Sequence, residues 1–377
     1  MAAGATIGSN HNSRAADGEI VAGRGFWPGL CVSLKHNSKF ASFTLIAKGD
    51  FPAELHIPIP FSLVSNEVSN DKLVIMPGYW FLYNMYALAR NSVKYESRDK
   101  RAFKNQLIEY DFLAPDSVNE IFDALQLMKK AVGEAGQKKI GEKFSEEEIV
   151  KFGLLLLEQK SDLSKDEILI SGFENTSRKV QLIKVTEAYH LFKELIIYYG
   201  ITQLIACIET EKINSMEQLI KIMGKPVRSE WTNIGGQLVP QPAINKLIQN
   251  IHTGKISSWD DVHTFYKESS QLYYQHKREH AFASMLEILR ITPAAFTKKL
   301  FLQLLQQTVA TKGWMVKGIY ESRAKDYASP FRQMVYDTQK EMEKVIGKLK
   351  DNAFILQQKE ELVQFKKRVA VVSKKLS

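Results

Sequence analysis

Two His-Asn-Ser triplets in the first forty residues have side chains that could carry chemistry. They are His11-Asn12-Ser13 and His36-Asn37-Ser38, and basic residues lie beside each. A histidine can act as a general base because its pKa lies near neutrality. The amides of Asn12 and Asn37, with backbone N–H groups, could bind an oxyanion or a phosphate. His36 and then His11 are therefore the candidate catalytic residues. The alternative is that each triplet is a turn, since Asn and His tolerate the left-handed backbone conformation.

A second candidate follows between them, at Arg24-Gly25-Phe26-Trp27-Pro28-Gly29. Trp27 offers a flat wall on which a base or a sugar could stack, and Arg24 offers a cation for a phosphate. We place Arg24 and Trp27 with Asn12 and Asn37 as candidate substrate-binding residues. The alternative is a turn at a structural corner, packed by Trp27.

His276 and His280 have the spacing of two metal ligands on one face of a helix. The pattern here is HKREH, which differs from the HExxH of zinc proteases, and no third ligand follows. We interpret it as a solvated helix face. The sequence predicts no metal and no cofactor.

The elements that would position the N-terminal candidates are short strands. Three fragments share an aliphatic residue, a small residue and a turn: Ile7-Gly8-Ser9-Asn10, Val21-Ala22-Gly23-Arg24-Gly25 and Ile46-Ala47-Lys48-Gly49-Asp50. In a triangular parallel β-helix one aliphatic side chain of each strand points inward, and Gly or Asn provides the turn. The pattern predicts the end of such a β-helix over residues 1–76. The alternative is an antiparallel meander.

From Pro77 onward the period of the apolar residues is helical. Residues 77–97, a helix capped at Asp116-Ser117 and a helix beginning at Ser145 are the first of many expected helices. The segment 224–240 contains two prolines and three glycines and is expected to be a long loop.

The last helix, 352–376, has an apolar seam that must be buried against another surface. The seam is formed by Ile355, Leu362, Phe365, Val369, Val372 and Leu376. We expect it to pack on the protein's own helix 293–324 and to leave the lysines from 366 to 375 in solvent.

Composition limits the class of protein. The 377 residues are 45% hydrophobic and 25% charged, the balance of a folded protein. The longest apolar run, 195–208, is shorter than the ~20 residues that cross a bilayer, so we expect no membrane partner. Two cysteines and an N-terminus without a signal peptide favour the cytoplasm. Residues 348–377 hold eight Lys or Arg against three Asp or Glu, but no RNA-binding signature accompanies them, so we do not expect nucleic acid as a partner.

Three stretches of the chain resemble an uncharacterised bacterial family, a domain of unknown function. They are GATIGSNHNSRAADGEIVAGRGFWPGLCVSLKHNSKFASFTLIAKGDFPAELHIPIPFSLVSN, MPGYWFLYNMYALARNSVKYESRDKR and the helical remainder with EWTNIGGQLVP and ESRAKDYASPFRQMVYD. The resemblance implies a left-handed β-helix of the hexapeptide-repeat type, related to acyltransferases and to the β-helix portions of sugar nucleotidyltransferases. In such acyltransferases a histidine at a coil edge is the general base, the role that the resemblance implies for His36 or His11. The family's proteins are usually longer, so Met1 is expected to be an internal methionine.

The sequence therefore predicts a mixed β and α fold, the end of a left-handed parallel β-helix followed by a mostly α-helical domain. The expected domains are 1–76, 77–230 and 231–377. The expected function is a transferase-like protein that handles a nucleotide-sugar or acyl donor, as a homo-oligomer. The alternative is a non-catalytic binding or scaffold protein whose helical domain recognises a partner.

Overall fold

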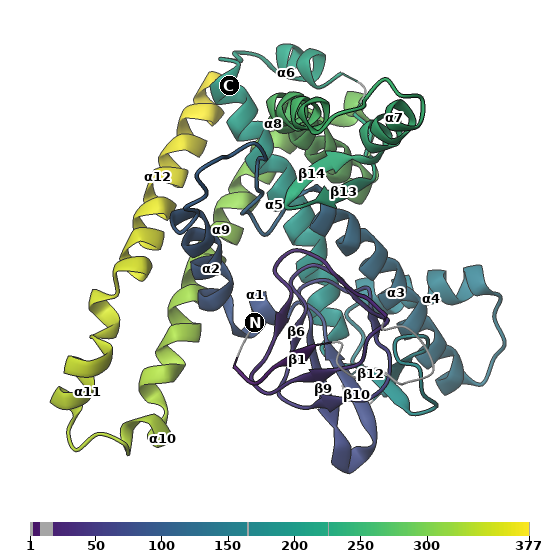
Figure 1. Cartoon of the computed structure of the whole chain (residues 1–377), viewed down its shortest axis with the longest axis vertical. Coiled ribbons are helices and arrows are strands. Elements are labelled where there is room, and N and C mark those ends of the chain that lie inside the picture. The colour runs from purple at the N-terminus through teal and green to yellow at the C-terminus, as the bar shows by residue number, and fades with distance from the viewer. Residues whose placement is uncertain (1–2, 8–17, 164–165, 225, 377) are drawn as a thin grey trace. The chain divides into compact units, whose positions relative to one another are not determined.

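The computed structural model describes residues 3–7, 18–163, 166–224 and 226–376 (Figure 1). The chain divides into two units, each made of two segments. The first unit contains residues 1–79 and 116–193, and the second contains residues 80–115 and 194–377. The sequence predicts three consecutive domains, and this division into two units does not test that prediction.

Short strands fill the N-terminal part of the first unit. They are β1 (Thr6–Ile7), β2 (Ile20–Ala22), β3 (Trp27–Pro28), β4 (Ser33–Leu34), β5 (Ser38–Phe40), β6 (Leu45–Ile46), β7 (Asp50–Phe51), β8 (His56–Ile57), β9 (Leu63–Glu67) and β10 (Lys72–Met76). A 3₁₀ turn, η1 (Val68–Asn70), joins the last two, and β11 (Ile168–Ile170) and β12 (Lys179–Leu182) follow much later. The inward residues are aliphatic or aromatic, among them Leu34, Ile46 and Phe51, and they are fully buried.

These strands form small parallel and mixed sheets. Two sheets have three strands each, in the orders β1-β4-β7 and β2-β5-β8, and all of their pairs are parallel. The third has the order β11-β12-β10-β9-β6-β3 and is mixed, because β9–β10 and β11–β12 are antiparallel pairs.

The predicted left-handed β-helix is wrong. The structure is a mixed α/β fold, 58% helical, with small sheets and no β-helix indicated. The repeated fragments did identify strands β2 and β6 and the turns beside them. An aliphatic residue before a turn specifies a short buried strand, but it does not specify which strands pair or how the sheet continues. Here the sheet continues into antiparallel strands.

Two helices of the first unit cross with their backbones in contact. They are α3 (Pro115–Ile140) and α4 (Glu146–Glu158), and α4 begins with the capping box that Ser145 and Glu148 predict. A Cβ at Gly153 would lie 1.8 Å from the carbonyl oxygen of Lys129. Only glycine permits this crossing.

The second unit is helical apart from one hairpin. Its elements are α2 (Met85–Ser97), α6 (Met216–Met223), β13 (Trp231–Ile234), β14 (Gln237–Pro240), α7 (Gln241–His252), α8 (Trp259–Leu289), η2 (Pro293–Ala295), α9 (Lys298–Ala328), α10 (Pro330–Gln333), α11 (Gln339–Ile346), η3 (Leu349–Asp351) and α12 (Ala353–Lys375). Helices α1 (Tyr79–Tyr83) and α5 (Val185–Thr210) begin in the first unit's residues and continue into the second's. The expected long loop at 224–240 is wrong in its second half, because residues 231–240 pair as the antiparallel hairpin β13–β14.

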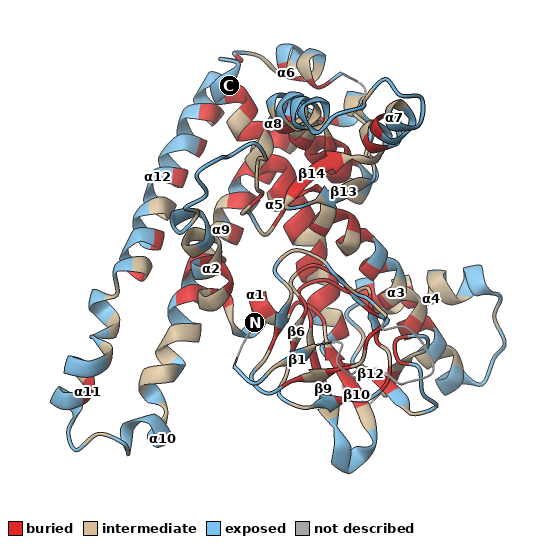
Figure 2. Ribbon diagram, in the orientation of Figure 1, coloured by how far each residue is buried: buried red, intermediate tan, exposed pale blue. Residues whose placement is uncertain are grey.

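Helix α5 is a core helix of the second unit. By length and composition it is the one helix in the described residues that could cross a membrane, yet 61% of that window is buried inside the fold. Its residues from Ile197 to Ile208 pack with apolar residues of α6, α8, α9 and α12 in one cluster. Figure 2 shows this interior in red.

The seam of α12 packs on α9, as the sequence predicts. Phe365, Val369, Val372 and Leu376 are buried in the same cluster as Phe301, Leu304 and Leu305. The lysines from 366 to 375 are exposed. In Figure 2 most of α12 is pale blue, interrupted by red on the side that faces α9.

Candidate functional site

His36 lies at a bend immediately before β5, with a buried side chain. Its Nδ1 has no hydrogen-bond partner among the described residues. Asn37 follows in the left-handed conformation, at φ 58°, as expected for a turn. His36 influences Glu54, whose pKa is lowered by a hydrogen bond from Asn175, by a backbone N–H and by the charges of Lys35 and His36. A catalytic role for His36 and a binding role for Asn37 stay predictions; His11 and Asn12 lie outside the described residues.

Arg24 is engaged in a buried ion pair. Its guanidinium donates two hydrogen bonds to Asp116, of 2.7 and 2.8 Å, and lies over the ring of Phe43. This pairing neutralises the charge that we expected to meet a phosphate. Trp27 is exposed on β3, and the corner is instead packed by Phe26, which stacks on Phe40. The role of both residues in binding substrate stays a prediction.

Glu120 stands one turn after Asp116 on α3 and is the most perturbed acid of the first unit. Its carboxylate accepts a hydrogen bond of 2.9 Å from the backbone N–H of Ser42. Burial and the neighbouring charge of Asp116 raise the pKa of Glu120 to about 8.

A buried ionic network is the most polar part of the interior of the second unit. The ammonium of Lys277 on α8 lies 2.7 Å from Glu109 and 3.1 Å from Asp111. Tyr273, one turn earlier, donates its hydroxyl to Glu109. Burial alone favours the neutral amine, but the two carboxylates more than offset it, so the pKa of Lys277 is raised. The network ties the segment before α3 to α8.

His276 and His280 take part in packing around this network. The ring of Trp231 makes edge contacts with Tyr273, His276 and His280. His280 is almost fully buried, which corrects the expected solvated face at that position. Among the described residues no group of His, Cys, Asp or Glu is arranged to hold a metal ion.

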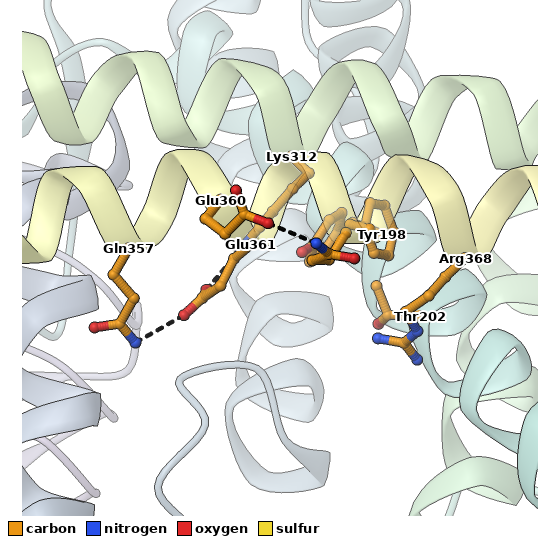
Figure 3. Close-up of a pocket in the computed structure, with 9 residues that line it drawn as sticks. Tyr198, Thr202, Lys312, Gln357, Glu360, Glu361 and Arg368 are labelled. Carbon is orange, nitrogen blue, oxygen red and sulfur yellow. Dashed lines mark hydrogen bonds and ion pairs between the residues drawn. The ribbon is translucent and has the colours of Figure 1, made fainter.

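An open pocket of about 600 Å³ lies among α5, α9 and α12, and we name it the α5–α9–α12 pocket (Figure 3). Nine residues line it: Tyr198, Thr202, Lys312, Gln357, Glu360, Glu361, Gln364, Phe365 and Arg368. The volume suits a small organic molecule. Eight of the nine side chains are polar or charged, and α12 contributes most of them.

Lys312 projects from α9 toward the pocket in Figure 3. Burial lowers its pKa, although the charges of Glu361 and Asp111 act in the opposite direction. Its ammonium lies 3.9 Å from Glu361. The pKa of Tyr198 is raised, mainly by burial, so its phenol remains protonated and able to donate a hydrogen bond.

The side of α12 opposite its buried seam forms an exposed strip of apolar and basic residues. We name Leu356, Val363, Lys367, Val371 and Lys374 the outer face of α12. They follow a helical spacing, and all five are exposed. In the described part of the chain neither Lys367 nor Lys374 takes part in an ion pair.

None of the pocket residues was a candidate from the sequence. The pocket's polar groups are spread over three helices between positions 198 and 368, and a single sequence shows no motif for such a set. The structure shows Lys312 as a basic residue one turn after the buried Thr308, on a face of α9 that is otherwise packed.

Comparison with known proteins gives similarities but no reaction. Residues 224–375 match a family described as "Domain of unknown function (DUF6819)". An "Uncharacterized protein" of Treponema pallidum (strain Nichols) is 38% identical over 361 residues, which are 96% of this chain and 48% of that protein. The chain thus spans about half the length of this curated relative. No solved structure matches the chain. A family of unknown function is therefore supported, while the β-helix that we expected of it is not.

Proposed function

We propose that the second unit is a non-catalytic recognition module, in which the outer face of α12 binds an acidic amphipathic helix of a partner protein. One observation carries the proposal: apolar side chains and two lysines without an ion pair in the described part of the chain share an exposed face of α12. Leu356, Val363 and Val371 are each about half exposed, at 49%, 45% and 53%. Lys367 and Lys374 lie between and beyond them on the same face.

The distribution of charge supports an acidic partner. Residues 298–377 contain 17 Lys or Arg and 8 Asp or Glu, an excess equal to the net charge of +9 of the whole chain. The positive potential is therefore concentrated on α9, α12 and the segment between them. Such a field speeds the encounter with an acidic surface and disfavours basic ones.

The chemistry of this face fits a helix better than other anionic partners. Apolar anchors at 356, 363 and 371 have the spacing with which an amphipathic helix contacts a helical surface. Nucleic acid would leave these aliphatic groups unused, and the face lacks the aromatic and arginine residues that stack on bases. An anionic membrane is usually met by Trp or Phe, which the face also lacks. A second copy would bring the unpaired lysines together.

The transferase-like function has lost its main support. It depended on a β-helix, and the sheets of the first unit are of another kind. His36 remains the residue through which such an activity would act. His36→Ala would abolish transfer of an acyl or sugar group if His36 were the general base.

The proposal is tested by binding of a fluorescent peptide of Leu and Glu heptads, measured by anisotropy on the full chain. The double variant Lys367→Glu/Lys374→Glu should weaken binding at least tenfold, a change of about 1.4 kcal/mol. Lys344→Glu, on α11, is the matched control because that lysine is also exposed but lies outside the outer face. Tighter binding of duplex DNA or of anionic vesicles than of the peptide would contradict the proposal. So would a dimer, seen by sedimentation, that the double variant dissociates.

A further inference from the structure

The α5–α9–α12 pocket adjoins the outer face, because Glu360 of its lining lies one turn after Leu356, but the proposed function does not use the pocket. It combines a volume of about 600 Å³ with a lining in which positive and negative groups are equal in number. Lys312 and Arg368 are the cations, and Glu360 and Glu361 are the anions. The lining therefore carries no net charge.

The charged groups of the pocket already have partners. Arg368 holds Glu209 with two hydrogen bonds, of 2.9 and 2.5 Å, and this contact raises the pKa of Arg368. Glu361 accepts a hydrogen bond of 2.9 Å from Gln357 and lies 3.9 Å from Lys312. Glu360 accepts one from Gln364. Figure 3 shows the contact of Gln357 with Glu361 on the α12 side of the pocket.

A charged ligand would disturb this balance. An anion in the pocket would lie beside the carboxylates of Glu360 and Glu361, and a cation would lie beside Lys312. Lys312 and Arg368 already face Glu361 and Glu209, and Glu360 is exposed to solvent, so neither charge would meet a buried counter-charge that still lacks a partner. A neutral ligand avoids the cost of desolvating such a charge.

The polar groups that line the pocket are suited to hydrogen bonding with the hydroxyl groups of a ligand. A hydroxyl both donates and accepts, so it can be satisfied by lysine and amide N–H donors on one side and by carboxylate and amide oxygens on the other. The phenol of Tyr198 and the hydroxyl of Thr202 come from α5, opposite the amides of α12. Phe365 is buried at the base and supplies an apolar surface for the C–H face of a ring.

We propose that the α5–α9–α12 pocket binds a small, neutral, hydroxyl-rich molecule of the mono- or disaccharide class. On the α5 side Tyr198 donates a hydrogen bond to the molecule, and Thr202 accepts one, because its own hydroxyl already donates to the carbonyl of Tyr199. Lys312 donates from α9, and the Gln and Glu side chains of α12 complete the set.

Isothermal titration calorimetry on the full chain tests the proposal with glucose, N-acetylglucosamine and maltose. Glucose 6-phosphate and spermidine serve as the anionic and cationic probes. We expect at least one neutral sugar to bind and to bind more tightly than either charged probe. If both charged probes bind better, or if no neutral sugar binds, the proposal is overturned.

Two conservative variants locate the site. Tyr198→Phe and Thr202→Val each remove one hydroxyl while keeping the size of the side chain, and each should raise the Kd of the bound sugar about fivefold. Tyr274→Phe is the matched control, because Tyr274 is an exposed tyrosine of α8 that does not line the pocket. Circular dichroism confirms that each variant is folded. Unchanged affinity in both pocket variants would show that the sugar binds elsewhere.

Discussion

At the scale of single residues, two interior titratable groups have pKa values that are raised by their surroundings in the fold. Glu120 and Lys277 are interior members of helices α3 and α8. Their environments come from residues distant in the chain, Ser42 for Glu120 and Glu109 for Lys277. Each environment predicts a measurable effect on stability.

Glu120→Gln should make the protein more stable at high pH. The pKa of Glu120 rises from 4.5 in the unfolded chain to about 8 in the fold, so the folded state binds more protons between these values. In the wild type, the contribution of protonated Glu120 to the free energy of unfolding is therefore full below pH 4.5. It is lost as the pH rises from there through 8. Glutamine stays neutral at every pH. The free energy of unfolding of the variant, relative to that of the wild type, should therefore increase with pH, by at most about 5 kcal/mol at pH 9.

Urea unfolding at pH 5, 7 and 9 measures this gain. Glu134→Gln is the control, since Glu134 is an exposed carboxylate of the same helix and should show no such trend. A Glu120→Gln variant that is equally stable relative to wild type at pH 5 and pH 9 would contradict the burial of this carboxyl.

Lys277→Met should destabilise the second unit strongly. The change leaves the carboxylate of Glu109 buried without its cation, and removing one member of a buried pair costs about 3–5 kcal/mol. The double variant Lys277→Met/Glu109→Gln removes the second charge as well, so it should recover at least half of the loss. Chemical denaturation gives both values, with Lys267→Met as an exposed control on the same helix. If the double variant is no more stable than the single one, the pair is not the origin of the effect.

At the scale of elements, the spacing between helices depends on single glycines. Gly153 and Gly133 face each other's helices where α4 crosses α3, with virtual Cβ distances of 1.8 and 1.9 Å to backbone oxygens. Gly313 on α9, by contrast, has nothing within 4 Å of a virtual Cβ. Replacement of glycine by alanine should therefore change the free energy of unfolding in opposite directions at Gly153 and Gly313.

Gly153→Ala should lower the free energy of unfolding by about 2–3 kcal/mol or more, because the added methyl forces the two helices apart. Gly313→Ala should raise it by roughly 0.5–1 kcal/mol, because alanine loses less backbone entropy in a helix. Thermal denaturation of the two variants decides the comparison. Equal melting temperatures would mean that α3 and α4 do not cross at this distance.

At the scale of the whole molecule, the second unit depends on one core to which α5, α6, α8, α9 and α12 all contribute. Deletion of residues 352–377 should therefore expose the α9 residues Phe301, Leu304 and Leu305, lower the melting temperature and cause aggregation. Light scattering measures the aggregation. Val371→Ala is a control, since Val371 lies on the outer face and should change stability by less than about 0.5 kcal/mol. A soluble truncated protein with an unchanged melting temperature and an altered oligomeric state would mean that α12 is an assembly helix.

The sequence by itself determined the helices and the side of α12 that is buried. A cap such as Ser145 with Glu148 and a heptad seam such as Phe365, Val369 and Val372 are local patterns, and local patterns report which element forms and which face is apolar. It also located short strands and turns, as at Asn37. It did not determine the sheets, because strand pairing is set by contacts between distant segments.

Only the tertiary structure decided where polar groups meet. Arg24 pairs with Asp116, 92 positions away, so the cation that we expected to bind a ligand is part of an ion pair. Lys277 pairs with Glu109, 168 positions away, and lies at the centre of a buried network. The pocket likewise joins Tyr198, Lys312 and Gln357 from three helices. A side chain's chemistry depends on its burial and its neighbours within a few ångströms, and in this fold those neighbours are brought together by packing rather than by position in the chain.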